Sequence, residues 1–162
     1  MTRPDEQYVL TPHEMLLSAN VGTVRNVEDI TEGRHHLLGD LTTPFGNGWN
    51  GNIEGACGEW AVSRYTGRQY LGVGTMGGDD VGSGLQVRTT GDPNGYLTVR
   101  RKDHPDKVYV LVVGKAPRLT LRGWLYGYEM KRDEWWSDPY QRNHWAWYVP
   151  QDALRPMVDL VR

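Results

Sequence analysis

The segment from Gly77 to Gly91, GGDDVGSGLQVRTTG, brings together the side chains of this chain that are best suited to chemistry. Asp79 and Asp80 stand in a glycine-rich turn, and the strand-like stretch LQVRTT follows at once. Side chains two positions apart on a strand share a face, so Gln86 and Arg88 are predicted to point the same way. Carboxylate and amide oxygens can bind a divalent cation, and a guanidinium can bind a phosphate. A plain turn followed by a solvated sheet face is the alternative interpretation.

A further carboxylate is predicted to lie on a helix that precedes this turn. Residues 53–65 carry apolar side chains at helical spacing, and Gly67 supplies the C-terminal stop. Glu59 falls beside the apolar stripe, on a flank shared with small residues such as Gly55 and Ala56. Because small neighbours let another backbone approach closely, Glu59 is predicted to face a packed segment. A surface carboxylate on the helix is the alternative.

The elements that must position these residues can be predicted from the patterns around them. Thr11, Pro12 and Glu14 form a helix start, and the helical pattern runs towards RNVEDI with an interruption near Gly22. The stretch 39–52 is crowded with Gly, Pro and Asn and predicts an ordered loop. After the second helix, strands are predicted at the following segments: weakly at 68–73, then at 85–90, 95–101, 107–114 and 118–127.

Helices followed by a run of strands predict an α+β or α/β fold with a central mixed β-sheet flanked by helices. The almost continuously apolar KVYVLVVG predicts a strand covered on both faces. The chain of 162 residues is predicted to be a single domain, 1–162. Its parts are an N-terminal helical part 11–67, a sheet core 68–128 and an aromatic-rich C-terminal part 129–162.

Composition limits the classes of function. The net charge of −2 excludes a uniformly basic protein, so any contact with nucleic acid must come from a local patch. The single cysteine, Cys57, allows no internal disulfide and lies on an apolar stripe, where it is predicted to be a small core residue. No apolar run of membrane length and no secretory leader pattern is seen, so a cytoplasmic location without membrane contact is expected.

The order of the chemical residues resembles that of the restriction-endonuclease-like PD-(D/E)XK nuclease superfamily. A helix carries Glu59, a turn carries Asp80, and the next strand carries Gln86-Val87-Arg88. The segments GACGEWAV, DDVGSGLQVRTT and VYVLVVG…LRGWLYG are similar to small phage-encoded proteins of that superfamily, over about residues 53–128. The resemblance implies a restriction-endonuclease-like core, Mg²⁺ or Mn²⁺ as cofactor and hydrolysis of DNA phosphodiesters in the host cytoplasm.

The resemblance also implies roles for individual residues. Asp80 would be the first metal ligand, Glu59 a direct or outer ligand, and the Val87 carbonyl or the Gln86 side-chain oxygen a third. The pattern departs from the family where Gln86 replaces an acid and Arg88 replaces a lysine. Glutamine brings no negative charge, and arginine does not deprotonate in proteins but binds phosphate in a bidentate manner. Two hypotheses stay open: a metal-dependent nuclease, or a catalytically silent relative that binds nucleic acid or a host defence protein.

Basic and aromatic side chains downstream provide candidates for nucleic-acid contacts. Those predicted to contact phosphates are Arg88, Arg100, Arg101, Lys102 and Arg122, with ordinary surface charge as the alternative.

The tryptophans 135, 136, 145 and 147 could stack on unpaired bases or cover the sheet. Seven Trp and nine Tyr against one Phe would also suit an all-β module that binds a sugar or small molecule, although the two helical patterns argue against it. No zinc site is expected, because the histidines lack partners at ligand spacing. A homodimer is left open, since many nucleases of this class act as dimers.

Overall fold

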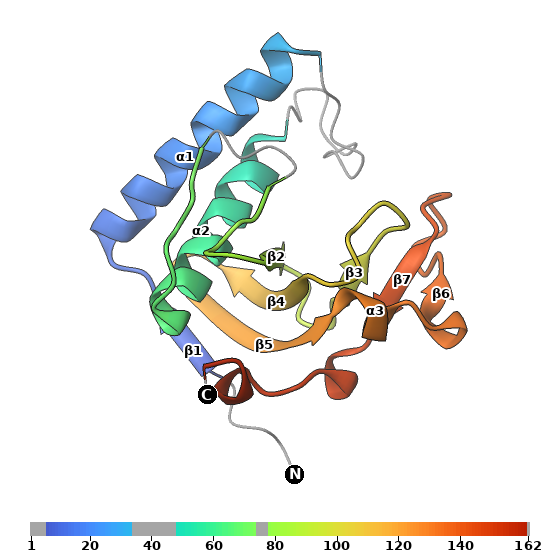
Figure 1. Cartoon of the computed structure of the whole chain (residues 1–162). Coiled ribbons are helices and arrows are strands. Elements are labelled where there is room, and N and C mark those ends of the chain that lie inside the picture. The colour runs from blue at the N-terminus through green and yellow to red at the C-terminus, as the bar shows by residue number, and fades with distance from the viewer. Residues whose placement is uncertain (1–5, 34–47, 74–77, 162) are drawn as a thin grey trace.

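The computed structural model describes residues 6–33, 48–73 and 78–161. Two long helices lie on one face of a four-stranded sheet, and a three-stranded sheet lies beside the opposite face (Figure 1). The predicted α+β class is therefore confirmed. None of the described helices is long and apolar enough to cross a membrane.

The first long helix, α1 (Pro12–Thr31), begins where the sequence predicts. Thr11 and Glu14 form the capping box through two reciprocal hydrogen bonds between side chain and backbone. The predicted interruption at Gly22 is wrong, because the helix runs through it without a break. Gly22 is instead the point of closest approach to the second helix, since a Cβ there would lie 2.5 Å from the Ile53 Cα.

The second long helix, α2 (Trp49–Thr66), begins at Trp49 rather than at the predicted Ile53, so the predicted loop 39–52 is wrong for residues 49–52. Residues 39–47 of that predicted loop lie outside the described residues. It ends at Gly67, whose left-handed φ of 68° provides the predicted stop. The helix lies between α1 and the four-stranded sheet (Figure 1). Gly58 allows α2 to lie close to the sheet, because a Cβ there would lie 1.9 Å from the Thr89 Oγ1.

The four-stranded sheet is mixed, as predicted. Its strand order is β1 (Glu6–Val9), β5 (Arg118–Tyr126), β4 (Val108–Lys115) and β2 (Leu85–Thr90). Strands β2 and β4 are parallel, whereas β4 and β5, and β5 and β1, are antiparallel. The segment 68–73 forms no strand but only an isolated bridge from Tyr70 to Val81. Strand β2 lies at an edge of the sheet, beside the turn that carries the aspartates.

A second, antiparallel sheet is made by strands from the later part of the chain. It consists of β3 (Leu97–Val99), β7 (Ala146–Val149) and β6 (Trp136–Ser137), in that order. The sequence predicts one sheet core over 68–128, which would include β3. In the structure β3 is not part of the four-stranded sheet and pairs with β7. The remaining short segments are α3 (Gly127–Met130) and 3-10 turns at Asp133–Trp135, Gln151–Ala153 and Met157–Asp159.

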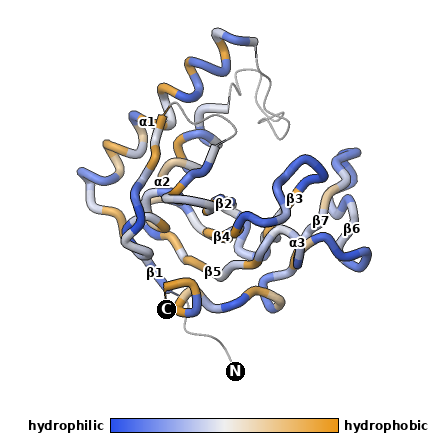
Figure 2. The backbone as a smooth tube through the Cα atoms, viewed as in Figure 1, coloured by the Kyte–Doolittle hydropathy of each residue, from blue (hydrophilic) through white to orange (hydrophobic). Residues whose placement is uncertain are grey.

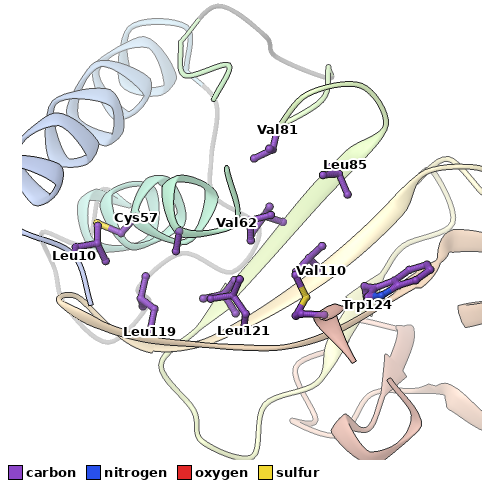
Figure 3. Packing of buried hydrophobic residues seen from close by; sticks show 13 residues of the cluster. Leu10, Cys57, Val62, Val81, Leu85, Val110, Leu119, Leu121 and Trp124 are labelled. Carbon is purple, nitrogen blue, oxygen red and sulfur yellow. The ribbon is translucent and has the colours of Figure 1, made fainter. Parts of the chain in front are cut away.

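Strand β4 is covered on both faces, as its apolar sequence predicts. Val110 and Val112 belong to the core under α2, where Cys57 is buried as predicted (Figure 3). Tyr109 and Leu111 belong to the second core, against β3 and β7. The tube in Figure 2 is hydrophilic (blue) in the segments around β3, β6 and β7, beyond this second core. The two cores thus fix the first sheet, and the loops beside the second sheet are hydrophilic.

Candidate functional site

Glu59 lies on α2, is only 6 % exposed and faces α1. Arg25 of α1 binds both of its oxygens, with Nη1 donating to Oε1 at 2.8 Å and Nη2 donating to Oε2 at 2.7 Å. The same guanidinium donates to the carbonyl oxygen of Gly72. Glu59 therefore faces a packed segment. Sequence reasoning missed Arg25, although its position three residues after the buried Gly22 places it beside the face that meets α2.

The adjacent aspartates of the turn have different partners. Asp79 forms an ion pair with the Lys107 Nζ at 2.8 Å and accepts a hydrogen bond from the Gly84 N–H at 2.9 Å. Asp80 accepts a hydrogen bond through Oδ2 from the Val87 N–H at 2.7 Å. Within the described ranges, no cationic side chain lies within ion-pair distance of Asp80, and its Oδ1 accepts no hydrogen bond. Asp80 is thus the carboxylate of this turn with coordinating capacity left.

Gln86 lies on the face of β2 opposite to Leu85 and Val87, which belong to the core under α2. Its side-chain amide donates to the Gly78 carbonyl at 2.8 Å and towards the Asp79 Oδ1 at 3.4 Å. Gln86 thereby braces the turn through Asp79 rather than approaching Asp80.

Arg88 shares its face of β2 with Gln86 but points to different partners. It forms an ion pair with Asp103 at 3.4 Å, and its guanidinium carbon lies 5.2 Å from the centre of the Tyr109 ring. Its Nη1 also donates to the Val87 carbonyl at 3.3 Å. The Arg88 side chain is 32 % exposed, so the guanidinium remains accessible to a ligand.

Electrostatic interactions connect these groups. Burial raises the pKa of Glu59 to about 7, Arg25 opposes that rise, and the charge of Asp80 adds to it. Burial also raises the pKa of Asp80, whereas the Val87 N–H and the charges of Arg88 and Arg25 oppose the rise. Since the charged forms of both carboxylates are disfavoured, an additional cation beside Asp80 would stabilise them.

The residues fit a hydrated Mg²⁺ or Mn²⁺, which needs only one or two carboxylates and keeps several waters. The Oδ1 of Asp80, which accepts no hydrogen bond among the described residues, would be the direct ligand. The Val87 carbonyl already accepts a hydrogen bond from the Arg88 Nη1. Glu59 fits an outer position, because Arg25 already binds both of its oxygens. The described residues do not fit a cation whose ligands all come from protein side chains. Among the described residues, no three His, Cys, Asp or Glu side chains are grouped to hold a metal.

Arg88 also lines a groove of about 1010 Å³ between β2 and the second sheet. The basic side chains that line this groove are Arg88, Arg100, Arg101, Lys102 and Arg142. The structure thus brings together four of the five residues predicted to contact phosphates. Arg122 on β5 is not part of the lining. Arg142 was missed, because the sequence gives no sign that its loop returns to β3.

The four tryptophans of the C-terminal part divide between the two predicted roles. Trp135 and Trp147 pack against the second core and cover it. Trp136 and Trp145 line the groove together with three tyrosines. The lining tyrosines are Tyr96, Tyr140 and Tyr148. Trp145, which is 56 % exposed, is therefore available to stack on a ligand, whereas Trp136 already contacts Arg101, Trp145 and Trp147.

Comparison of the chain with protein-family models, with curated proteins and with solved structures finds no match. The nuclease resemblance therefore stays a prediction from the residues that carry it.

Proposed function

We propose that the protein hydrolyses phosphodiester bonds of DNA, with Mg²⁺ or Mn²⁺ bound at Asp80. The observation that carries this proposal is the difference between the acidic groups around β2. Asp79 and Glu59 are each paired with a basic side chain, whereas Asp80 keeps one oxygen without a partner among the described residues. The charge of Arg88, an arginine that reaches the groove, also acts on Asp80.

Each residue of the site has a role in this proposal. A bound divalent cation would neutralise phosphate charge and lower the pKa of an attacking water. Asp80 would hold that cation, and Arg88 would bind and orient the phosphate group. Arg88 cannot act as the general base, because arginine keeps its proton in proteins. A cation bound at Asp80 would favour the charged form of Glu59, which Arg25 holds in place.

The experiment is a cleavage assay on supercoiled, linear and single-stranded DNA with Mg²⁺, Mn²⁺ or EDTA. We expect metal-dependent cleavage that falls at least about 100-fold in Asp80→Asn, because that variant loses the direct ligand. Asp79→Asn is the matched control, since it changes the adjacent carboxyl in the same turn and should keep most of the activity. Absence of cleavage by the unmodified protein, or equal activity of Asp80→Asn, would refute the hydrolytic function.

The second candidate is a catalytically silent protein that binds nucleic acid or a host defence protein. The observation that favours it is the charge balance of the site. Arg25 binds both oxygens of Glu59, and the charges of Arg25 and Arg88 favour the charged form of Asp80 without a metal. This candidate predicts DNA binding in EDTA that weakens steeply with salt, and no cleavage under any metal condition.

A further inference from the structure

We infer that the groove between β2 and the second sheet is a binding site for single-stranded nucleic acid. The inference extends the proposed function. Only the statement that the bound strand is the substrate rests on that function. Binding itself needs neither the metal nor Asp80. The occupant is identified by the chemistry of the groove, which presents basic side chains and exposed aromatic rings together.

The charge of the groove favours a polyanion. Five basic side chains line it, against two acidic ones, Asp92 and Asp138. Within the part of the chain that the structure describes, the cations at 100, 101, 102 and 142 make no ion pair with a carboxylate. The whole chain has a net charge of −2, so this basic patch is local rather than a consequence of composition. Unpaired cations along a groove are suited to the phosphates of a strand.

The aromatic rings of the groove favour unpaired bases. Trp136 and Trp145 are stacked, with ring centres 6.2 Å apart and planes inclined by 28°. Trp145 is 56 % exposed and Tyr140 is 46 % exposed, so their faces are open to a ligand. Arg101 lies over Trp136, with its guanidinium carbon 4.7 Å from the ring centre. Guanidinium and indole groups that lie side by side suit the phosphates and bases of one strand.

The form of the site favours a single strand over a duplex. Bases in a duplex are stacked on one another, so their faces are not available to Trp145 or Tyr140. Proteins read a duplex by placing a helix or ribbon into one of its grooves, whereas this site is itself a groove. A strand bound here would pass Arg88, which faces the groove and also acts on the charge of Asp80. Arg88 is therefore the residue that the inferred groove and the proposed hydrolytic site share.

The test is fluorescence anisotropy with a labelled oligothymidine and a duplex of equal length, in EDTA so that no hydrolysis occurs. Trp145→Ala is expected to weaken binding of the single strand by about fivefold or more, since it removes a stacking platform. Its matched control is Tyr128→Ala, because Tyr128 is 58 % exposed and lies outside the groove lining.

A second matched pair tests the charges. Arg101 and Arg132 are both exposed, and each lies over a tryptophan, Trp136 and Trp135 respectively. Arg101→Gln is expected to weaken binding and to lower the salt dependence by about one phosphate contact. Arg132→Gln, outside the groove lining, is expected to leave both unchanged.

The outcomes separate this inference from the proposed function. Tighter binding of the duplex than of the single strand, or equal losses in the groove and control variants, would overturn the groove assignment whatever the cleavage assay shows. Preferential binding of the single strand that is lost in the groove variants alone would support the assignment, even if Asp80→Asn and the unmodified protein are equally inactive.

Discussion

The two faces of strand β2 differ in what they contact. On one face, Leu85 and Val87 are buried under α2, and Thr89 lies against Gly58 of that helix. On the other face, Arg88 lines an open groove together with the basic and aromatic side chains of the second sheet. The first face holds the fold together, and the second leaves charge and ring surface available to a ligand. An edge strand can thus serve stability and binding at once, because its side chains alternate between its faces.

Disturbing the packed face should produce the largest effect on stability. Gly58→Ala is expected to lower the free energy of unfolding by about 1–3 kcal/mol, because a Cβ there would lie 1.9 Å from the Thr89 Oγ1. Threonine cannot easily turn away, since its χ1 is restricted. Urea titration followed by circular dichroism measures the change.

Two controls sharpen this comparison. Gly55→Ala, on the same helix and with nothing within 4 Å of its Cβ, should raise stability by about 0.5–1 kcal/mol. Arg88→Ala on the open face should cost less than about 1 kcal/mol, because its ion pair with Asp103 is partly exposed. A larger loss in Arg88→Ala than in Gly58→Ala would contradict the division between the two faces.

A pH-dependent effect on stability is expected from the buried Glu59 carboxyl. Burial raises the pKa of Glu59 from 4.5 to about 7, so the folded protein retains a proton that the unfolded chain releases between these values. This contribution to stability is complete below pH 4.5 and is lost as the pH rises through 7. Glu59→Gln should therefore flatten the fall in unfolding free energy across this window.

Unfolding titrations at several pH values measure that slope. The control is Glu134→Gln, whose carboxyl is 62 % exposed and far less desolvated. A slope that is the same in Glu59→Gln and in the unmodified protein would show that the Glu59 carboxyl does not take up a proton in this window.

The local elements of the fold could be predicted, because their signals lie in neighbouring residues. The capping box at Thr11 and Glu14, the stop at Gly67 and the doubly covered strand β4 depend on short patterns. The predicted interruption of the first helix at Gly22 is wrong, because this glycine allows the close approach of α2 and does not end the helix. Strand β3 was placed in the wrong sheet, since its partner β7 lies far along the chain.

Some features of the candidate site could likewise be predicted from the sequence, and others could not. Period-two alternation placed Gln86 and Arg88 on one face of β2, and four predicted phosphate-binding residues line the groove. The partners of the carboxylates could not be predicted, because Arg25 reaches Glu59 from a separate helix and Lys107 reaches Asp79 from beyond β3. Which of two adjacent aspartates keeps a free oxygen depends on those distant partners.

The central claim, that Asp80 holds a divalent cation, is tested most directly by adding substoichiometric Mn²⁺ and recording the broadening of backbone amide NMR signals. The account predicts that the Val87 amide, 2.7 Å from the Asp80 Oδ2, is among the first to broaden. The effect should disappear in Asp80→Asn and persist in Asp79→Asn. Broadening that centres elsewhere, or that is unchanged in Asp80→Asn, would contradict the claim.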